Sequence, residues 1–237
     1  MVFLVAEIGV NWDGDFEVVK QMMMESKKAG FNAVKFQSFS ETLVNDHPEK
    51  SRLLRSTITK NNVEKIDKLS KSIGIEWFCT PMYLDAVDFL DPFVKRFKIR
   101  EKDSKDFLKN NKSELVEKVL KTKKEVIMSI ETLPKESVYH THPQIKWLYC
   151  VPKYPCNLKE LDFRNLNDFD GFSNHCPNLI APLSASILGA KIIELHITSD
   201  KNKNFVDNNV SFDYNEMKEL LRLILISQEL KTQFNPG

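Results

Sequence analysis

The stretch Lys191–His196, KIIELH, is the last of eight short β-rich runs that alternate with helical segments along the chain. The other seven are Phe3–Ile8, Ala33–Gln37, Glu76–Cys79, Arg96–Ile99, Val126–Ser129, Lys146–Cys150 and Gly171–Ser173. Eight β/α alternations in one domain predict an α/β fold, a single (β/α)8 TIM barrel. An open doubly wound sheet is the alternative, but no GxGxxG or Walker sequence follows any run, which disfavours a nucleotide-binding sheet.

Amphipathic segments with the helical period separate these runs. They are Phe16–Ala29, Asn62–Ile73, Ser113–Lys121, Pro182–Leu188 and Tyr214–Glu229. Gly30 and Gly74 are expected to stop the first two helices, and Asn61 and Asp213 to act as N-caps. The helical pattern is weak after the fifth and sixth strands, so we expect short or irregular pieces there.

Length and composition indicate one globular domain, residues 1–237. Hydrophobic residues make up 42% and charged residues 28%, and the net charge of +1 favours neither nucleic acid nor an acidic membrane as partner. No apolar run is long enough for a bilayer, and Met1–Val10 lacks the basic start of a signal peptide. The four cysteines form no CxxC pair, so we expect reduced thiols in a cytoplasmic protein rather than a zinc knuckle.

Polar side chains interrupt the apolar runs where the predicted strands end. They include Glu7, Lys35, Gln37, Thr80, Lys98, Arg100, Ser129, Tyr154, Ser173, His175, Glu194 and His196. In a barrel the chemistry lies at the carboxyl ends of the strands, and burying so many polar groups without partners is costly. The sequence therefore predicts an active site at this rim.

His175 and His196 follow neighbouring strands. Two imidazoles there suit one divalent metal and leave positions for water and substrate. The alternative is a pair of hydrogen-bonded structural histidines, and spacing alone does not decide between them. His47, within Asn45–Pro48, is expected to be an ordinary loop residue.

Lys35 and Lys98 both lie in strand patterns and would face the site. Such lysines suit an anion, phosphate or carboxylate, while a Schiff-base lysine is a rival interpretation. Ion pairs with Glu7 or Glu194 are a third possibility. Glu7 itself suits a general acid or base, or a group that steers a substrate hydroxyl, unless it only pairs with Lys35.

Seven motifs occur in order at these strand ends. They are AEIGVN at Ala6–Asn11, AVKFQ at Ala33–Gln37, CTP at Cys79–Pro81, FKI at Phe97–Ile99, CxxxYP at Cys150–Pro155, GFSNH at Gly171–His175 and LGAKIIExHxT at Leu188–Thr198. Together they resemble the sialic acid synthase family, which comprises N-acetylneuraminate synthase and its legionaminate and pseudaminate relatives.

The resemblance implies a (β/α)8 barrel that condenses phosphoenolpyruvate with an N-acetylated amino sugar, using manganese or magnesium. It implies that His175 and His196 bind the metal and that Glu7, Lys35 and Lys98 are catalytic. Thr80 and Ser129 would join the two lysines in holding phosphoenolpyruvate. Substrate would also contact residues that line the site, namely Gln37, Tyr154, Ser173 and the acid Asp207 after strand eight.

Several positions depart from the family. Arg100 begins a segment, Arg100–Asp103, where relatives have Gly-Ser-Gly-Glu, so its side chain would either replace a backbone contact to phosphate or block the pocket. Glu131 stands where a glycine-containing loop is usual, and Asn174 where an aspartate is usual. The family's C-terminal antifreeze-like domain is expected to be absent. The sequence therefore does not identify the acceptor sugar, and a homodimer is one option for the assembly. The alternative function is a catalytically impaired barrel that binds a sugar phosphate or acts as scaffold partner of a full-length synthase.

Overall fold

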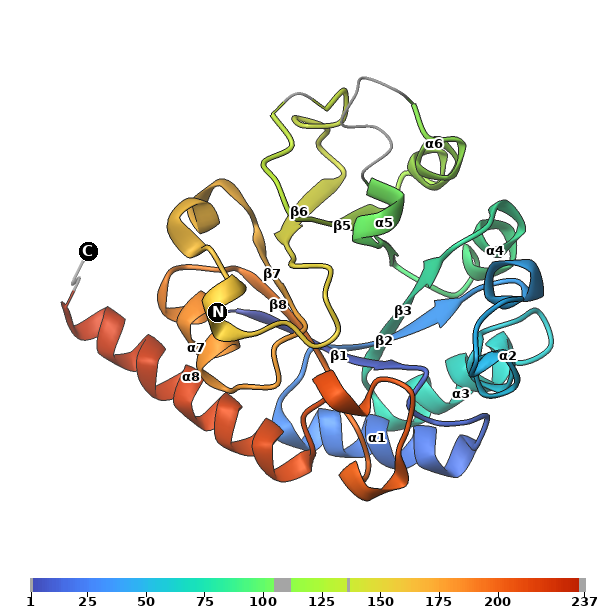
Figure 1. Ribbon diagram of the computed structural model, residues 1–237, viewed down its shortest axis with the longest axis horizontal. Helices are drawn as coiled ribbons and strands as arrows, with labels where there is room; N and C mark the ends of the chain where they lie inside the picture. Colours follow the sequence, from blue (N-terminus) through green and yellow to red (C-terminus); the bar gives the residue numbers. More distant parts are fainter. Residues whose placement is uncertain (1, 105–111, 136, 235–237) are drawn as a thin grey trace.

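Eight parallel strands pair in chain order and close into a barrel, because β1 also pairs with β8. The computed structural model describes residues 2–104, 112–135 and 137–234 (Figure 1). The strands are β1 Phe3–Gly9, β2 Ala33–Ser38, β3 Glu76–Pro81, β4 Arg96–Ile99, β5 Glu125–Ile130, β6 Ile145–Tyr149, β7 Gly171–Asn174 and β8 Ile192–His196. Each predicted strand matches within two residues at either end, and the (β/α)8 TIM barrel is confirmed.

Helices connect the strands and surround the barrel (Figure 1). The α-helices are α1 Phe16–Ala29, α2 Lys50–Ser56, α3 Val63–Ile73, α4 Leu84–Leu90, α5 Glu101–Ser104, α6 Glu114–Lys121, α7 Ile180–Ile187 and α8 Tyr214–Phe234. Among the described residues that link β5 to β6, none lies in a helix, and β6 is followed by the 3-10 turns η3 Leu158–Glu160 and η4 Phe163–Asp168. The expected irregular connections are therefore confirmed. Three further 3-10 turns, η1 Glu41–Val44, η5 Lys201–Lys203 and η6 Asn208–Val210, lie in other loops.

The helix ends show which local signals in the sequence were correct. Gly30 ends α1 in the left-handed conformation, with φ of 104°. The Asp213 carboxylate accepts hydrogen bonds from the N–H groups of Asn215 and Glu216, as predicted for the N-cap of α8. The prediction for Asn61 is wrong, because α3 begins one residue later behind Asn62.

Strand register brings the polar strand ends together at one rim of the barrel. Glu7 in β1 pairs with Lys35 in β2 on one side and with His196 in β8 on the other. Ser173 in β7 pairs with Glu194 in β8. Because all strands are parallel, these side chains converge at the carboxyl end of the barrel. No helix of the described residues is long and apolar enough to cross a membrane.

Candidate active site

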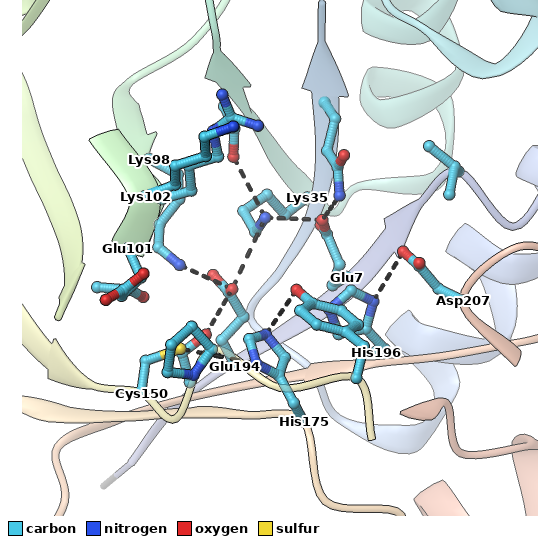
Figure 2. Close-up of a pocket in the computed structure, with 18 of the residues that line it drawn as sticks. Glu7, Lys35, Lys98, Glu101, Lys102, Cys150, His175, Glu194, His196 and Asp207 are labelled. Atoms are coloured by element: carbon cyan, nitrogen blue, oxygen red, sulfur yellow. Dashed lines mark hydrogen bonds and ion pairs between the residues drawn. The ribbon is translucent and has the colours of Figure 1, made fainter. Parts of the chain in front are cut away.

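A cavity of about 500 Å³ opens at this rim (Figure 2). The twelve residues that the sequence predicts for the site all line it: Glu7, Lys35, Gln37, Thr80, Lys98, Arg100, Ser129, Tyr154, Ser173, His175, His196 and Asp207. They come from every strand except β6 and from the loops that follow the strands, with Tyr154 in the loop after β6. The fold therefore brings together side chains that are up to about two hundred residues apart in the chain.

Four buried charged side chains form a continuous chain of ion pairs in the cavity (Figure 2). We call them the charged quartet: Glu7, Lys35, Glu194 and Lys98. Lys35 Nζ lies 2.8 Å from Glu7 Oε1 and 3.7 Å from Glu194 Oε1. Lys98 Nζ lies 2.8 Å from the same Glu194 oxygen. The ion pairs considered for these lysines are thus present, and the charged quartet carries no net charge.

Burial and neighbouring charges act in opposite directions on the quartet. Burial lowers the pKa of Lys35, but Glu194 and Glu7 outweigh it, so the pKa lies above its ordinary value. The pKa of Lys98 is lowered by burial and by the nearby Lys35, despite Glu194. Burial works against ionisation of Glu194, yet the two lysines lower the pKa of this carboxyl to about 2. Glu194 is therefore a carboxylate at neutral pH.

Hydroxyl and amide groups complete the quartet's surroundings. Gln37 Nε2 donates to Glu7 Oε1 at 2.8 Å, Ser173 Oγ donates to Glu194 Oε1 at 3.0 Å, and Lys35 Nζ donates to Thr80 Oγ1 at 3.3 Å. Within the described residues, the second carboxylate oxygens of Glu7 and Glu194 and the hydroxyl of Ser129 have no hydrogen-bond partner. Buried polar atoms are normally paired, so these three atoms indicate a place for water or a ligand.

The two histidines lie side by side at the ends of β7 and β8, with ring centroids 5.5 Å apart. His175 Nδ1 is 2.8 Å from the carbonyl oxygen of Val151, and its Nε2 is 2.7 Å from the Tyr154 hydroxyl. His196 Nδ1 lies 3.3 Å from Asp207 Oδ2. The pairing with His196 lowers the pKa of Asp207 although burial raises it.

This donor set fits a divalent metal with open coordination positions. Two imidazoles suit a divalent metal that takes its remaining ligands from water or substrate. No group of three or more His, Cys, Asp or Glu side chains within the described ranges is placed to hold an ion. His175 Nδ1 bonds the Val151 carbonyl oxygen, and His196 Nδ1 lies 3.3 Å from Asp207 Oδ2 without a hydrogen bond. A metal-binding histidine typically directs one ring nitrogen at an oxygen and leaves the other for the metal. In His175 that second nitrogen lies 2.7 Å from the Tyr154 hydroxyl, so a metal ion would have to displace this contact.

The pKa of His175 is lowered to about 3, first by burial and then by the neighbouring His196. The unfolded chain takes up this proton near the ordinary value of about 6.5, so stability is lost as pH falls from that value toward 3. We expect His175 to account for about 2 kcal/mol of lost unfolding free energy between pH 7 and pH 5. Urea unfolding in EDTA at both pH values should show a smaller loss for His175→Gln than for the unchanged protein; equal losses would contradict the assignment.

Two departures from the family pattern have clear structural consequences. Arg100 lines the cavity, but its guanidinium is paired with Asp103, with Nε 2.5 Å from Oδ2. Asn174 is directed away from the cavity and bonds both the carbonyl and the N–H of Cys176. An aspartate carboxylate could accept the hydrogen bond from the Cys176 N–H but could not donate one to the Cys176 carbonyl oxygen. The asparagine therefore stabilises the local backbone.

Sequence reasoning missed other residues of the cavity wall, among them Glu101, Lys102, Cys150 and Pro152, and it named Glu194 at the rim without giving it a role in the site. Glu194 is the most important, because it joins both lysines. A signal was present in the sequence: residues two apart in a strand face the same side, and Glu194 precedes His196 by two. His47, expected to be an ordinary loop residue, also lines the cavity.

Comparison with known proteins identifies the family of this chain. Residues 22–234 match the NeuB family. The chain is 28% identical to N,N'-diacetyllegionaminic acid synthase of Legionella pneumophila, over 94% of this chain and 71% of that protein. It is 25% identical to human N-acetylneuraminate-9-phosphate synthase, over 94% of this chain and 69% of that protein. An uncharacterized protein of Methanocaldococcus jannaschii is 29% identical, over 96% and 71%.

The fold has a solved counterpart in a sialic acid synthetase from Leptospira borgpetersenii, determined in complex with citrate. The TM-score is 0.85 at 24% identity, with 97% of this chain and 84% of the other covered. The resemblance stated from the strand-end motifs is confirmed. The family match spans most of the sequence, and this chain therefore belongs to the NeuB family.

Proposed function

We propose that this chain is a sialic acid synthase-like enzyme that condenses phosphoenolpyruvate with an N-acetylamino sugar aldehyde, in a metal-dependent reaction that forms a 2-keto-3-deoxy sugar acid. The observation that carries the proposal is one cavity lined by two buried lysines and by two neighbouring histidines. The lysines suit the anionic phosphoenolpyruvate, and a metal on the two histidines suits the carbonyl group of the acceptor sugar.

Phosphoenolpyruvate would bind at the two lysines. Lys35, Lys98, Thr80 and Ser129 hold its carboxylate and phosphate, and the unpaired Ser129 hydroxyl supplies a free donor. The charged quartet is neutral, so the attraction for this anion also needs a cation from outside the quartet. Arg100 and Lys102 at the same cavity are available from the chain.

The acceptor sugar would lie between the quartet and the histidines. Manganese or magnesium, held by His175 and His196, would act as a Lewis acid on the sugar aldehyde. C3 of phosphoenolpyruvate forms the new bond to the aldehyde carbon, water adds at C2, and phosphate leaves with cleavage of its C–O bond. Glu7, whose free carboxylate oxygen borders the cavity, is suited to hold or move a proton at the reacting oxygen.

The test is phosphate release from phosphoenolpyruvate with Mn²⁺ and a panel of amino sugars and plain aldoses. We expect release with at least one acceptor, and loss of that activity in His196→Ala. His142→Ala, a histidine outside the cavity, is the matched control and should retain activity. Borohydride trapping of a pyruvate adduct would instead favour a Schiff-base lysine.

One observation favours the second candidate, a catalytically impaired barrel. Arg100 is engaged by Asp103, which reduces the positive charge it offers to a phosphate. If no acceptor in the panel gives phosphate release and Mn²⁺ does not bind, the chain is better described as a sugar-phosphate-binding or scaffold protein. Arg100 would then fill space that an active enzyme gives to substrate.

A further inference from the structure

Tyr154 covers His175 with both its ring and its hydroxyl group. The two ring centroids lie 4.0 Å apart at 33°, and the Tyr154 oxygen is 2.7 Å from His175 Nε2. The same tyrosine ring meets His196 edge-on, at 5.6 Å and 85°. Tyr154 therefore contacts both members of the candidate metal pair, although it belongs to the loop after β6.

The direction of the hydrogen bond between these two residues follows from the other side of the imidazole. His175 Nδ1 lies 2.8 Å from the Val151 carbonyl oxygen, which only accepts hydrogen bonds. Nδ1 therefore carries the proton, and Nε2 has the single lone pair of the neutral ring. The Tyr154 hydroxyl must donate to Nε2. One lone pair cannot accept this hydrogen bond and bind a metal ion at the same time.

We propose that the Tyr154 hydroxyl occupies His175 Nε2 in the absence of metal, and that metal binding releases this hydroxyl to donate to an oxygen of the acceptor sugar. The inference rests on the metal site of the proposed function. It makes Tyr154 a positioning residue that links occupancy of the metal site to recognition of the acceptor. A cation that enters first prepares the hydrogen-bond donor that the sugar then uses.

The surroundings of Tyr154 allow this exchange. The residue is 55% exposed, although its two histidine neighbours are buried, so the ring has open space on one side. Asp207 and Glu7 line the same cavity and offer carboxylate oxygens to a released hydroxyl before sugar arrives. Loss of the bond to Nε2 therefore does not leave the hydroxyl without an acceptor.

The test is Mn²⁺ binding to the full chain, measured by isothermal titration calorimetry. Tyr154→Phe keeps the ring contact and removes the competing hydroxyl, so we expect it to bind Mn²⁺ roughly two- to tenfold more tightly than the unchanged protein. Tyr149→Phe is the matched control, because that hydroxyl accepts from the Asp162 N–H outside the cavity. Its Mn²⁺ affinity should equal that of the unchanged protein.

A second readout follows the tyrosine itself. Adding Mg²⁺ should produce a tyrosine difference absorption spectrum in the unchanged protein and in Tyr149→Phe, but not in Tyr154→Phe. Mn²⁺ affinity of Tyr154→Phe that is equal to or weaker than that of the unchanged protein overturns the inference, as does a lack of Mn²⁺ binding by both. A merely structural role for Tyr154 would weaken metal binding rather than tighten it.

The inference and the proposed function fail separately. If Tyr154→Phe binds Mn²⁺ more tightly while no acceptor gives phosphate release, the hydroxyl competition stands and the synthase proposal falls. If phosphate release requires Mn²⁺ but Tyr154→Phe has unchanged affinity, the synthase proposal stands and the competition is refuted.

Discussion

Lys98→Met is expected to lower phosphate release by about 100-fold or more, because it removes a buried cation from the wall proposed to hold phosphoenolpyruvate. The lysine is 3% exposed and lies 2.8 Å from Glu194. Methionine keeps the length of the side chain without its charge. Initial rates at saturating acceptor should show the effect mainly as a higher KM for phosphoenolpyruvate. Lys95→Met, an exposed lysine outside the cavity, should change the rate far less.

Loss of one partner in a buried ion pair also costs stability, about 3–5 kcal/mol, because Glu194 keeps its charge without Lys98. The double variant Lys98→Met/Glu194→Gln removes both charges and should recover most of that unfolding free energy in urea. It should not recover phosphate release. Equal losses of activity in Lys98→Met and Lys95→Met, or recovery of activity in the double variant, would refute the role of Lys98 in binding.

The barrel and the membership of its active rim were predictable because both depend on patterns that are local in the sequence. A strand such as β8 is recognised from its own apolar residues, and the rule that parallel strands end at one rim then assembles the site. The places of His196 and Lys35 in the site were predicted from their positions at strand ends alone. Helix α4 was not predicted. It buries Ala86, Val87 and Leu90 on one face, but its seven residues are too few to show the helical period clearly.

The pairings inside the site were not predictable, because they depend on side-chain reach across the barrel. Glu194 serves Lys98 and Lys35 from strands that are far from it in sequence, and the sequence allowed Glu7 equally well. The bond from Tyr154 to His175 depends on the path of the loop after β6. Irregular loops lack a periodic pattern, so their side-chain directions come only from the folded structure.

At Gly171 a side chain would overlap the backbone of the neighbouring strand. It lies in β7 beside Ile192 of β8, and a Cβ atom placed on it would be 1.9 Å from the Ile192 carbonyl oxygen and 2.7 Å from the carbonyl carbon. Both atoms belong to backbone, so no rotamer change can relieve the overlap. The two strands would have to separate, and they carry His175 and His196 at their ends.

Gly171→Ala is therefore expected to lower the unfolding free energy by about 4 kcal/mol or more, enough to prevent folding if the protein is ordinarily stable. Gly74→Ala is the control, because its φ of 74° is strained for alanine but its added Cβ would contact nothing within 4 Å. That change should cost only about 1–2 kcal/mol. Urea unfolding of both variants decides the matter: similar losses would mean that backbone conformation, rather than the β7–β8 contact, requires glycine at Gly171.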